Sequence, residues 1–159
     1  MTRVGLGWDV HPFAPGRPLV LGGIEVPAPR GLGGHSDADV LTHAVADALL
    51  GALALGDLGQ HFPDSDPRYR GISSLALLAD VLGRVRAAGG RPVNVDATLV
   101  AETPRLAEHL DGMRKRLAET LELAVDRVSV KAKRAEGLGA LGRQEGIAAM
   151  VVALVEVAG

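Results

Sequence analysis

A chain of 159 residues is long enough for one domain with a sizeable core, and its 3% aromatic content requires a core built mainly from Ala, Val and Leu. Its 17 basic and 19 acidic residues nearly balance, which argues against a nucleic-acid partner. Because the chain has no cysteine, disulfides and thiolate metal sites are excluded, and any metal must bind to histidine nitrogen or carboxylate oxygen.

The first part of the chain predicts three strands and a loop. Apolar residues alternate over residues 4–10, which predicts a strand whose apolar face is buried. Residues 18–26 predict a β-hairpin that turns at Gly22 and Gly23. Residues 28–36 are rich in glycine and predict a loop.

Two helices separated by a long loop are expected next. Ser36 or Asp37 is suited to N-cap the first helix, whose apolar stripe leads to an end near Gly56. Residues 57–73 contain Asp-Pro and glycine punctuation and predict a mobile loop, whereas residues 74–87 predict the second helix.

Strands and a helix alternate in the rest of the chain. A strand is expected over residues 93–101, a third helix with Pro104 in its first turn, and a strand over residues 128–134. Residues 147–157 predict a final strand that is apolar on both faces, as in a central strand or an oligomer interface. The sequence therefore predicts one α+β domain over residues 1–159, with a mixed β-sheet and the order β-β-β-α-α-β-α-β-β.

The chain carries no pattern of export or membrane insertion. Its start lacks the basic flank and apolar stretch of a signal peptide, and the apolar run 147–155 is too short to cross a bilayer. We therefore expect a soluble, cytoplasmic protein with no membrane partner.

Three residues form a candidate metal site. Asp9 and His11 lie two apart on the first strand, so their side chains project from the same face. His43 lies among apolar residues of the first helix, where Asp39 and Asp47 at i−4 and i+4 are expected to orient its ring. Together Asp9, His11 and His43 make a Zn²⁺ set with one open position, as catalytic sites require. The alternatives are a solvent-facing polar pair and a core histidine.

Two loops and a charged strand end are candidate contacts for a phosphorylated ligand. His35 and Ser36 precede the first helix, where backbone N–H groups attract phosphate oxygens, although simple N-capping also explains them. The loop 56–67 carries three carboxylates and a histidine, which suits contacts with hydroxyls or an ordinary turn-rich loop. Residues 131–134 include three cations followed by Glu136, which indicates a solvent-facing strand end or an anion site with a carboxylate for a second cation.

The glycines of residues 137–142 match a dinucleotide-binding pattern that we reject. That fingerprint must open a helix and be followed by an acidic residue about 20 positions later. Here the glycines lead into a β-type run, and only seventeen residues remain after Gly142. The neighbouring Arg143 and Glu145 are a candidate ion pair at the surface or at an interface.

Several segments match the signatures of one family at the same spacings: Gly7-x-Asp9-x-His11, His35-Ser36-Asp37-x-Asp39-Val40, His43, residues 47–51, 55–59 and 62–66, Val130-Lys131-Ala132, Glu136-x-Leu138-Gly139 and Gly142-Arg143-x-Glu145-Gly146-Ile147. Over nearly the whole chain they resemble the 2-C-methyl-D-erythritol 2,4-cyclodiphosphate synthase family. The resemblance implies that the 2-phosphate of 4-diphosphocytidyl-2-C-methyl-D-erythritol 2-phosphate attacks the β-phosphorus. CMP would leave, and a cyclic diphosphate would form.

The resemblance also implies a homotrimer with its sites between subunits. Zn²⁺ would bind Asp9, His11 and His43, and Mg²⁺ or Mn²⁺ would bridge the α- and β-phosphates near Glu136. His35 and Arg134 are the implied catalytic residues. The implied substrate-binding residues are Asp9, His11, His35, Ser36, Asp57, Gly59, Asp64, Asp66, Ala101, Pro104, Arg105, Leu106, Ala132, Lys133, Arg134, Glu136 and Arg143. The cytidine pocket, residues 101–107 and 132–135, would come from a neighbouring subunit.

Two positions depart from the family's pattern. Arg134 stands where a hydroxyl residue is credited with stabilising the transition state. Ala140 stands where an aromatic residue lines a cavity on the threefold axis, next to the position of Arg143. Two other functions fit the same metal ligands: a Zn²⁺ phosphohydrolase that activates water, and a trimeric nucleotide-binding regulatory module with a structural metal.

Overall fold

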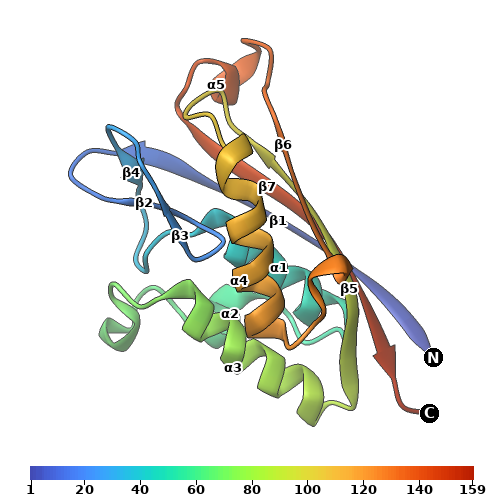
Figure 1. Cartoon of the computed structure of the whole chain (residues 1–159). Helices are drawn as coiled ribbons and strands as arrows, with labels where there is room; N and C mark the ends of the chain where they lie inside the picture. Colours follow the sequence, from blue (N-terminus) through green and yellow to red (C-terminus); the bar gives the residue numbers. More distant parts are fainter.

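A five-stranded sheet with helices on one face organises the fold (Figure 1). The computed structural model describes all residues, 1–159. The sheet order is β4-β1-β7-β5-β6, with β1 Thr2–Ala14, β4 Gly31–Leu32, β5 Gly90–Val100, β6 Val128–Lys133 and β7 Gly146–Val157. A separate hairpin consists of β2 Leu19–Leu21 and β3 Ile24–Val26. The helices are α1 Val40–Ala52, α2 Leu58–His61, α3 Ser74–Ala87, α4 Leu110–Leu121 and α5 Gly139–Gly142.

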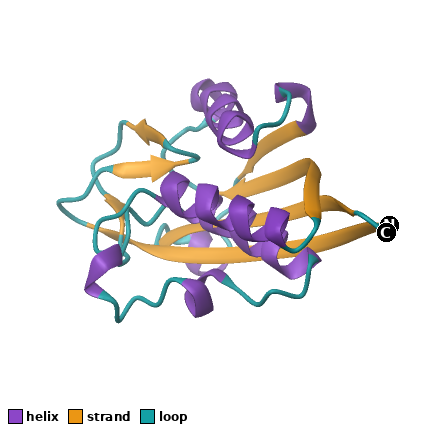
Figure 2. Ribbon diagram, turned by 90° about the horizontal axis from the view of Figure 1, so that it is seen from below, coloured by secondary structure: helices purple, strands orange, loops and turns teal.

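The last strand, β7, is the central strand that its two-sided apolar sequence predicts. It pairs antiparallel with β1 on one side and with β5 on the other, while β5 pairs parallel with β6. The predicted mixed α+β fold is therefore confirmed. Both termini lie at the same end of the sheet (Figure 2), where Met1 and Val157 are hydrogen-bonded. None of the helices has the length and apolar composition that a membrane crossing needs.

The prediction that the apolar face of the first strand is buried within the chain is wrong. That face is bare, and the side chains of Leu6 and Trp8 are 65% and 55% exposed. The opposite face packs on α1, so closely that a Cβ atom on Gly5 would lie 1.8 Å from Ala48 O and one on Gly7 would lie 1.9 Å from a carbonyl oxygen of the same helix. Alternation shows which residues share a face, but not which face the helix covers.

Two helices begin at other residues than the sequence predicts. The first helix is capped by Asp39 rather than by Ser36 or Asp37, because the Asp37 carboxylate accepts a hydrogen bond from the start of α3 instead. The third helix, α4, begins at Leu110, so Pro104 lies in the loop before it. Gly139 and Gly142 are the ends of the one-turn helix α5, Gly137 precedes it, and the segment then leads into β7, so the rejection of a dinucleotide-binding fold is confirmed.

Candidate metal centre

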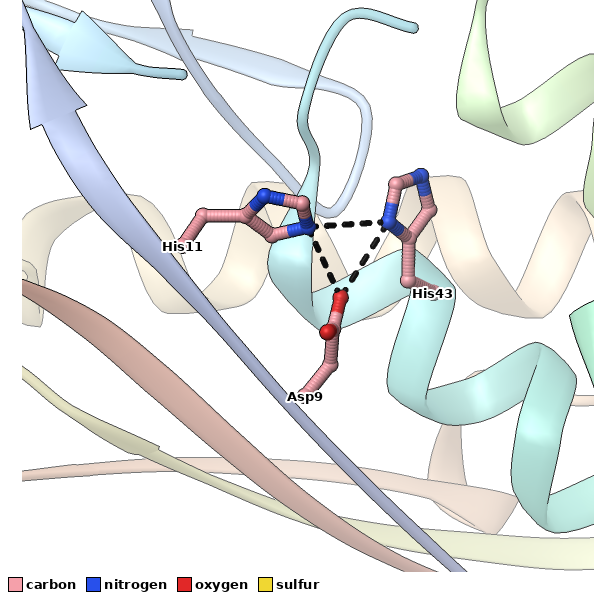
Figure 3. Close-up of side chains that lie close together, drawn as sticks. All are labelled: Asp9, His11 and His43. Atoms are coloured by element: carbon pink, nitrogen blue, oxygen red, sulfur yellow. Dashed lines mark hydrogen bonds and ion pairs between the residues drawn. The ribbon is translucent and has the colours of Figure 1, made fainter. Parts of the chain in front are cut away.

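The three predicted metal ligands converge at one point (Figure 3). Asp9 and His11 project from β1, and His43 projects from α1. Asp9 Oδ2 lies 2.9 Å from His11 Nε2 and 3.2 Å from His43 Nδ1, and the two ring nitrogens are 3.3 Å apart. Acceptor atoms this close repel one another unless a proton or a cation lies between them. The arrangement therefore fits a single metal ion held by one carboxylate and two imidazoles.

The outer nitrogens of both histidines take part in hydrogen bonds. His11 Nδ1 lies 2.8 Å from the carbonyl oxygen of Gly33 and donates to it. His43 Nε2 lies 2.8 Å from Ser74 Oγ and 3.1 Å from Ser36 Oγ. A histidine that ligates a metal is usually fixed through its second nitrogen in this way.

The prediction that the helical neighbours of His43 orient its ring is wrong. Asp39 is fully buried and accepts hydrogen bonds from the turn of the β2–β3 hairpin and from the first turn of α1. Asp47 accepts a hydrogen bond from the first residue of α2. Helical spacing places these carboxylates near His43, but each of them accepts hydrogen bonds from backbone N–H groups and not from the His43 ring.

Asp9 is held as a carboxylate. Burial alone would raise its pKa, but the adjoining imidazoles of His11 and His43 lower that pKa to about 2. For His11, burial would lower the pKa, but the hydrogen bond with Asp9, the negative charge of Asp9 and the hydrogen bond with Gly33 together raise it. One carboxylate oxygen and two imidazole nitrogens form a donor set that Zn²⁺ accepts in catalytic sites.

Two hollows border the metal ligands and contain, besides the ligands themselves, four of the predicted substrate contacts. One, of about 410 Å³, is lined by the three ligands together with Gly59 and Asp64. The other, of about 190 Å³, is lined by His11, His43, His35 and Ser36. His35 Nε2 also lies 2.9 Å from the Asp66 carbonyl oxygen, which ties the two loops of this hollow together.

Two predicted substrate contacts in the same region have other partners. The Asp57 side chain caps α2 by accepting a hydrogen bond from Gln60 N. The Asp66 side chain caps the 3-10 turn Pro67–Tyr69 and forms an ion pair with Arg68 at 2.6 Å. Neither carboxylate lines the hollows beside the metal ligands.

A separate cavity gathers most of the residues expected to bind cytidine. Its volume is about 270 Å³, and its lining includes Ala101, Pro104, Arg105, Leu106, Ala132, Lys133 and Arg134. It shares no lining residue with the hollows at the metal ligands. Within one chain, the two halves of the predicted site are therefore distinct.

The remaining predicted residues are exposed and lie apart from the metal ligands. Arg134 forms an ion pair at 3.1 Å with Glu102, whose side chain is only 4% exposed. Glu136 follows in a turn with a φ of 55°, which is a left-handed conformation. Arg143 forms a 2.7 Å ion pair with Glu145, as its sequence neighbourhood suggests.

The sequence interpretation missed one residue that supports the loop carrying His35 and Ser36. The Arg17 guanidinium donates to the carbonyl oxygens of Gly34 and Ser36, at 2.5 Å and 2.6 Å. These bonds fix the backbone that carries His35 and Ser36. Arg17 lies in a turn before the hairpin, and no local pattern connects it with a loop 17 residues later.

The fold and the site define a class: α+β proteins with three converging residues that can hold a metal ion beside hollows in the surface. The model of the YgbB family matches residues 2–156, and the chain belongs to this family. A 2-C-methyl-D-erythritol 2,4-cyclodiphosphate synthase of Syntrophomonas wolfei is 58% identical over 154 residues, which are 97% of this chain and 98% of that protein. The family resemblance of the motifs is thus confirmed.

Solved structures agree with the family assignment. The bifunctional IspDF from Campylobacter jejuni matches with a TM-score of 0.96 and 38% identity over 99% of this chain, which spans 43% of that longer protein. A 2C-methyl-D-erythritol-2,4-cyclodiphosphate synthase in a CDP-bound form matches with a TM-score of 0.89 and 37% identity, covering 97% of this chain and 100% of that one.

Proposed function

We propose that this chain converts 4-diphosphocytidyl-2-C-methyl-D-erythritol 2-phosphate to 2-C-methyl-D-erythritol 2,4-cyclodiphosphate with release of CMP. The observation that carries the proposal is the convergence of Asp9, His11 and His43 beside His35 and Ser36, in a member of a family whose relatives bear this synthase name. The CDP-bound relative supports a cytidine diphosphate portion in the substrate.

The residues present suit a reaction that depends on positioning and charge neutralisation. The attacking 2-phosphate is already anionic near neutral pH, so no strong base is needed. One phosphate oxygen forms a bond to the β-phosphorus while the bond from that phosphorus to the CMP oxygen breaks. Asp9, His11 and His43 would hold Zn²⁺, which would supply positive charge at the diphosphate. His35 and Ser36 offer hydrogen-bond donors in the adjoining hollow.

We place the complete site between two subunits of a homotrimer, with Mg²⁺ or Mn²⁺ near Glu136 as the second cation. The metal ligands and the proposed cytidine cavity lie in separate hollows of one chain, so a neighbouring chain can supply the second half. The bare face of the sheet supports assembly, because a contiguous apolar patch of this kind marks an interface. This face is 41% to 66% exposed at Val4, Leu6, Trp8, Val10, Met150 and Val152.

Phosphorus NMR of the substrate incubated with protein and Mg²⁺ tests the proposed reaction. Formation of the cyclic diphosphate together with CMP is the expected result. Release of free phosphate would identify a phosphohydrolase, and an unchanged substrate in the presence of both metals would favour a regulatory module.

Leu6→Glu is expected to convert the trimer to monomers. The side chain faces Val152 across the bare part of the sheet, so the variant would place a carboxylate in an apolar contact without a partner. Molar mass from light scattering after size-exclusion chromatography gives the result. Val125→Glu is the matched control, because Val125 is 37% exposed but lies in a 3-10 turn away from this face. A trimeric Leu6→Glu protein would contradict assembly through this face.

Arg134→Ala is expected to lower kcat and kcat/KM together, by roughly 10- to 100-fold. A hydrogen bond to a charged group contributes about 1.5 to 3 kcal/mol, and each 1.4 kcal/mol is about tenfold in rate. We assign the Arg134 guanidinium to the diphosphate, because it borders the proposed cytidine cavity and is anchored by Glu102. Arg134→Thr should recover part of the loss. Parental kinetics in Arg134→Ala would show that Arg134 has no part in the reaction.

A further inference from the structure

The outer nitrogen of His43 contacts Ser74, which lies 31 residues away in the sequence and is itself held by Asp37. His43 Nε2 lies 2.8 Å from Ser74 Oγ, at the start of α3. Ser74 Oγ in turn forms a short hydrogen bond with Asp37 Oδ1, and Ser74 N donates to Asp37 Oδ2 at 3.0 Å. Ser74 is fully buried, so water does not compete for these bonds.

Counting protons gives the direction of each hydrogen bond. An ionised carboxylate can only accept, so the single Ser74 hydroxyl proton is donated to Asp37. Ser74 Oγ must then accept from His43 Nε2–H. The proton of the neutral ring is therefore on Nε2, and the lone pair of Nδ1 points toward Asp9 Oδ2, 3.2 Å away.

We infer that Ser74 and Asp37 are positioning residues for the metal ligand His43. The inference rests on the metal centre of the proposed function. The Asp37 carboxylate holds the Ser74 hydroxyl, and this hydroxyl holds the outer nitrogen of His43. Such support fixes the tautomer and the orientation of the ring and raises the basicity of the nitrogen that binds the metal. It also connects the loop before α1, the ring on α1 and the first residue of α3 in one chain of hydrogen bonds.

The two metal-binding histidines differ in how they are supported. The outer nitrogen of His11 donates to a backbone carbonyl, that of Gly33, which a side-chain substitution leaves in place. The outer nitrogen of His43 depends on Ser74, with the Ser36 hydroxyl as a second oxygen at 3.1 Å. Metal affinity should therefore be sensitive to Ser74 and Asp37 although neither residue touches the metal.

The competing explanation is purely structural, because Asp37 also accepts the backbone N–H of Ser74 at the start of α3. Ser73 separates the two explanations. It is the N-cap residue of α3, yet its side chain makes no capping hydrogen bond. Ser73→Ala thus removes a hydroxyl from the same helix start without touching His43.

The test measures Zn²⁺ affinity by competition with a chromophoric chelator. Ser74→Ala is expected to weaken Zn²⁺ binding by about 10- to 100-fold, the range for lost support of a metal ligand, and Ser73→Ala to bind like the parent. Asp37→Asn keeps the size of the side chain but removes its charge, and it should also weaken binding. Thermal unfolding of the metal-free proteins shows whether a variant has merely lost its fold.

Nitrogen NMR of the metal-free parent gives an independent readout. The Nε2–H tautomer of His43 is expected in the parent, and a mixture of tautomers in Ser74→Ala. Parental Zn²⁺ affinity in both Ser74→Ala and Asp37→Asn, or an Nδ1–H tautomer in the parent, would overturn the positioning role alone. A parent that binds no Zn²⁺ would overturn the metal centre itself, and the positioning role with it.

Discussion

His43→Ala should remove the bound metal and lower kcat/KM by roughly 10³-fold, with the fold retained. A catalytic metal contributes several kcal/mol of transition-state charge stabilisation, and about 4 kcal/mol corresponds to this factor in rate. The side chain is 13% exposed at the edge of the hollows, so its truncation opens a polar space that water can fill. Elemental analysis should find about one metal ion per chain in the parent and none in the variant.

The matched control for this substitution is His109→Ala. His109 precedes α4 and lines neither of the hollows at the metal ligands, so its variant should keep both metal and turnover. If the His43→Ala protein contains no metal and still turns over at the parental rate, the metal has no part in catalysis.

Gly7→Ala is expected to lower the melting temperature by about 6 to 12 °C. A Cβ atom at this position would lie 1.9 Å from the carbonyl oxygen of Ala44, which belongs to the backbone of α1 and cannot rotate away. The helix would have to move off β1, at a cost of about 3 kcal/mol, and each kcal/mol is worth about 2 to 4 °C in a chain of this size. Because α1 carries His43, metal affinity should fall as well.

Gly51→Ala is the control for the glycine substitution. Gly51 lies on the exposed side of α1, and the nearest atom outside the helix to its Cβ would be Leu6 O at 3.9 Å, an ordinary contact. Alanine is favoured over glycine in a helix by about 1 kcal/mol, so this variant should melt at or above the parental temperature. Parental melting of Gly7→Ala would mean that α1 lies farther from β1 than the structure places it.

Asp9 and His11 were predictable as a pair because two residues two apart on a strand share a face. His43 is 32 residues from His11, and it was a candidate because an imidazole among the apolar residues of a helix completes a familiar donor set. Their supporting residues were not predictable in this way. Ser74 is 31 residues from His43, and Arg17 is 19 residues from Ser36, so only the folded chain brings them together.

The apolar face of β1 was predicted to be buried, and it is exposed because of a contact between segments that are distant in the sequence. Alternation of Leu6 and Trp8 with Gly5 and Gly7 shows two faces and predicts the apolar one to be the core. The glycine face is the one that α1 covers, because Gly5 and Gly7 have no Cβ atom and the backbone of α1 can pack directly on the strand. The apolar side chains are then left exposed on the opposite face of the sheet.

The bare sheet face also equips the protein with its own optical reporter. Trp8 is the only tryptophan of the chain, and it lies on this face opposite Met150 of β7. Its side chain points away from the face that carries Asp9 and His11, so it senses the outer environment of the sheet rather than the metal. The emission of an indole depends on whether water or apolar side chains surround it. The fluorescence of the unlabelled protein would therefore follow the proposed assembly of subunits, while the reaction site stays free of any dye.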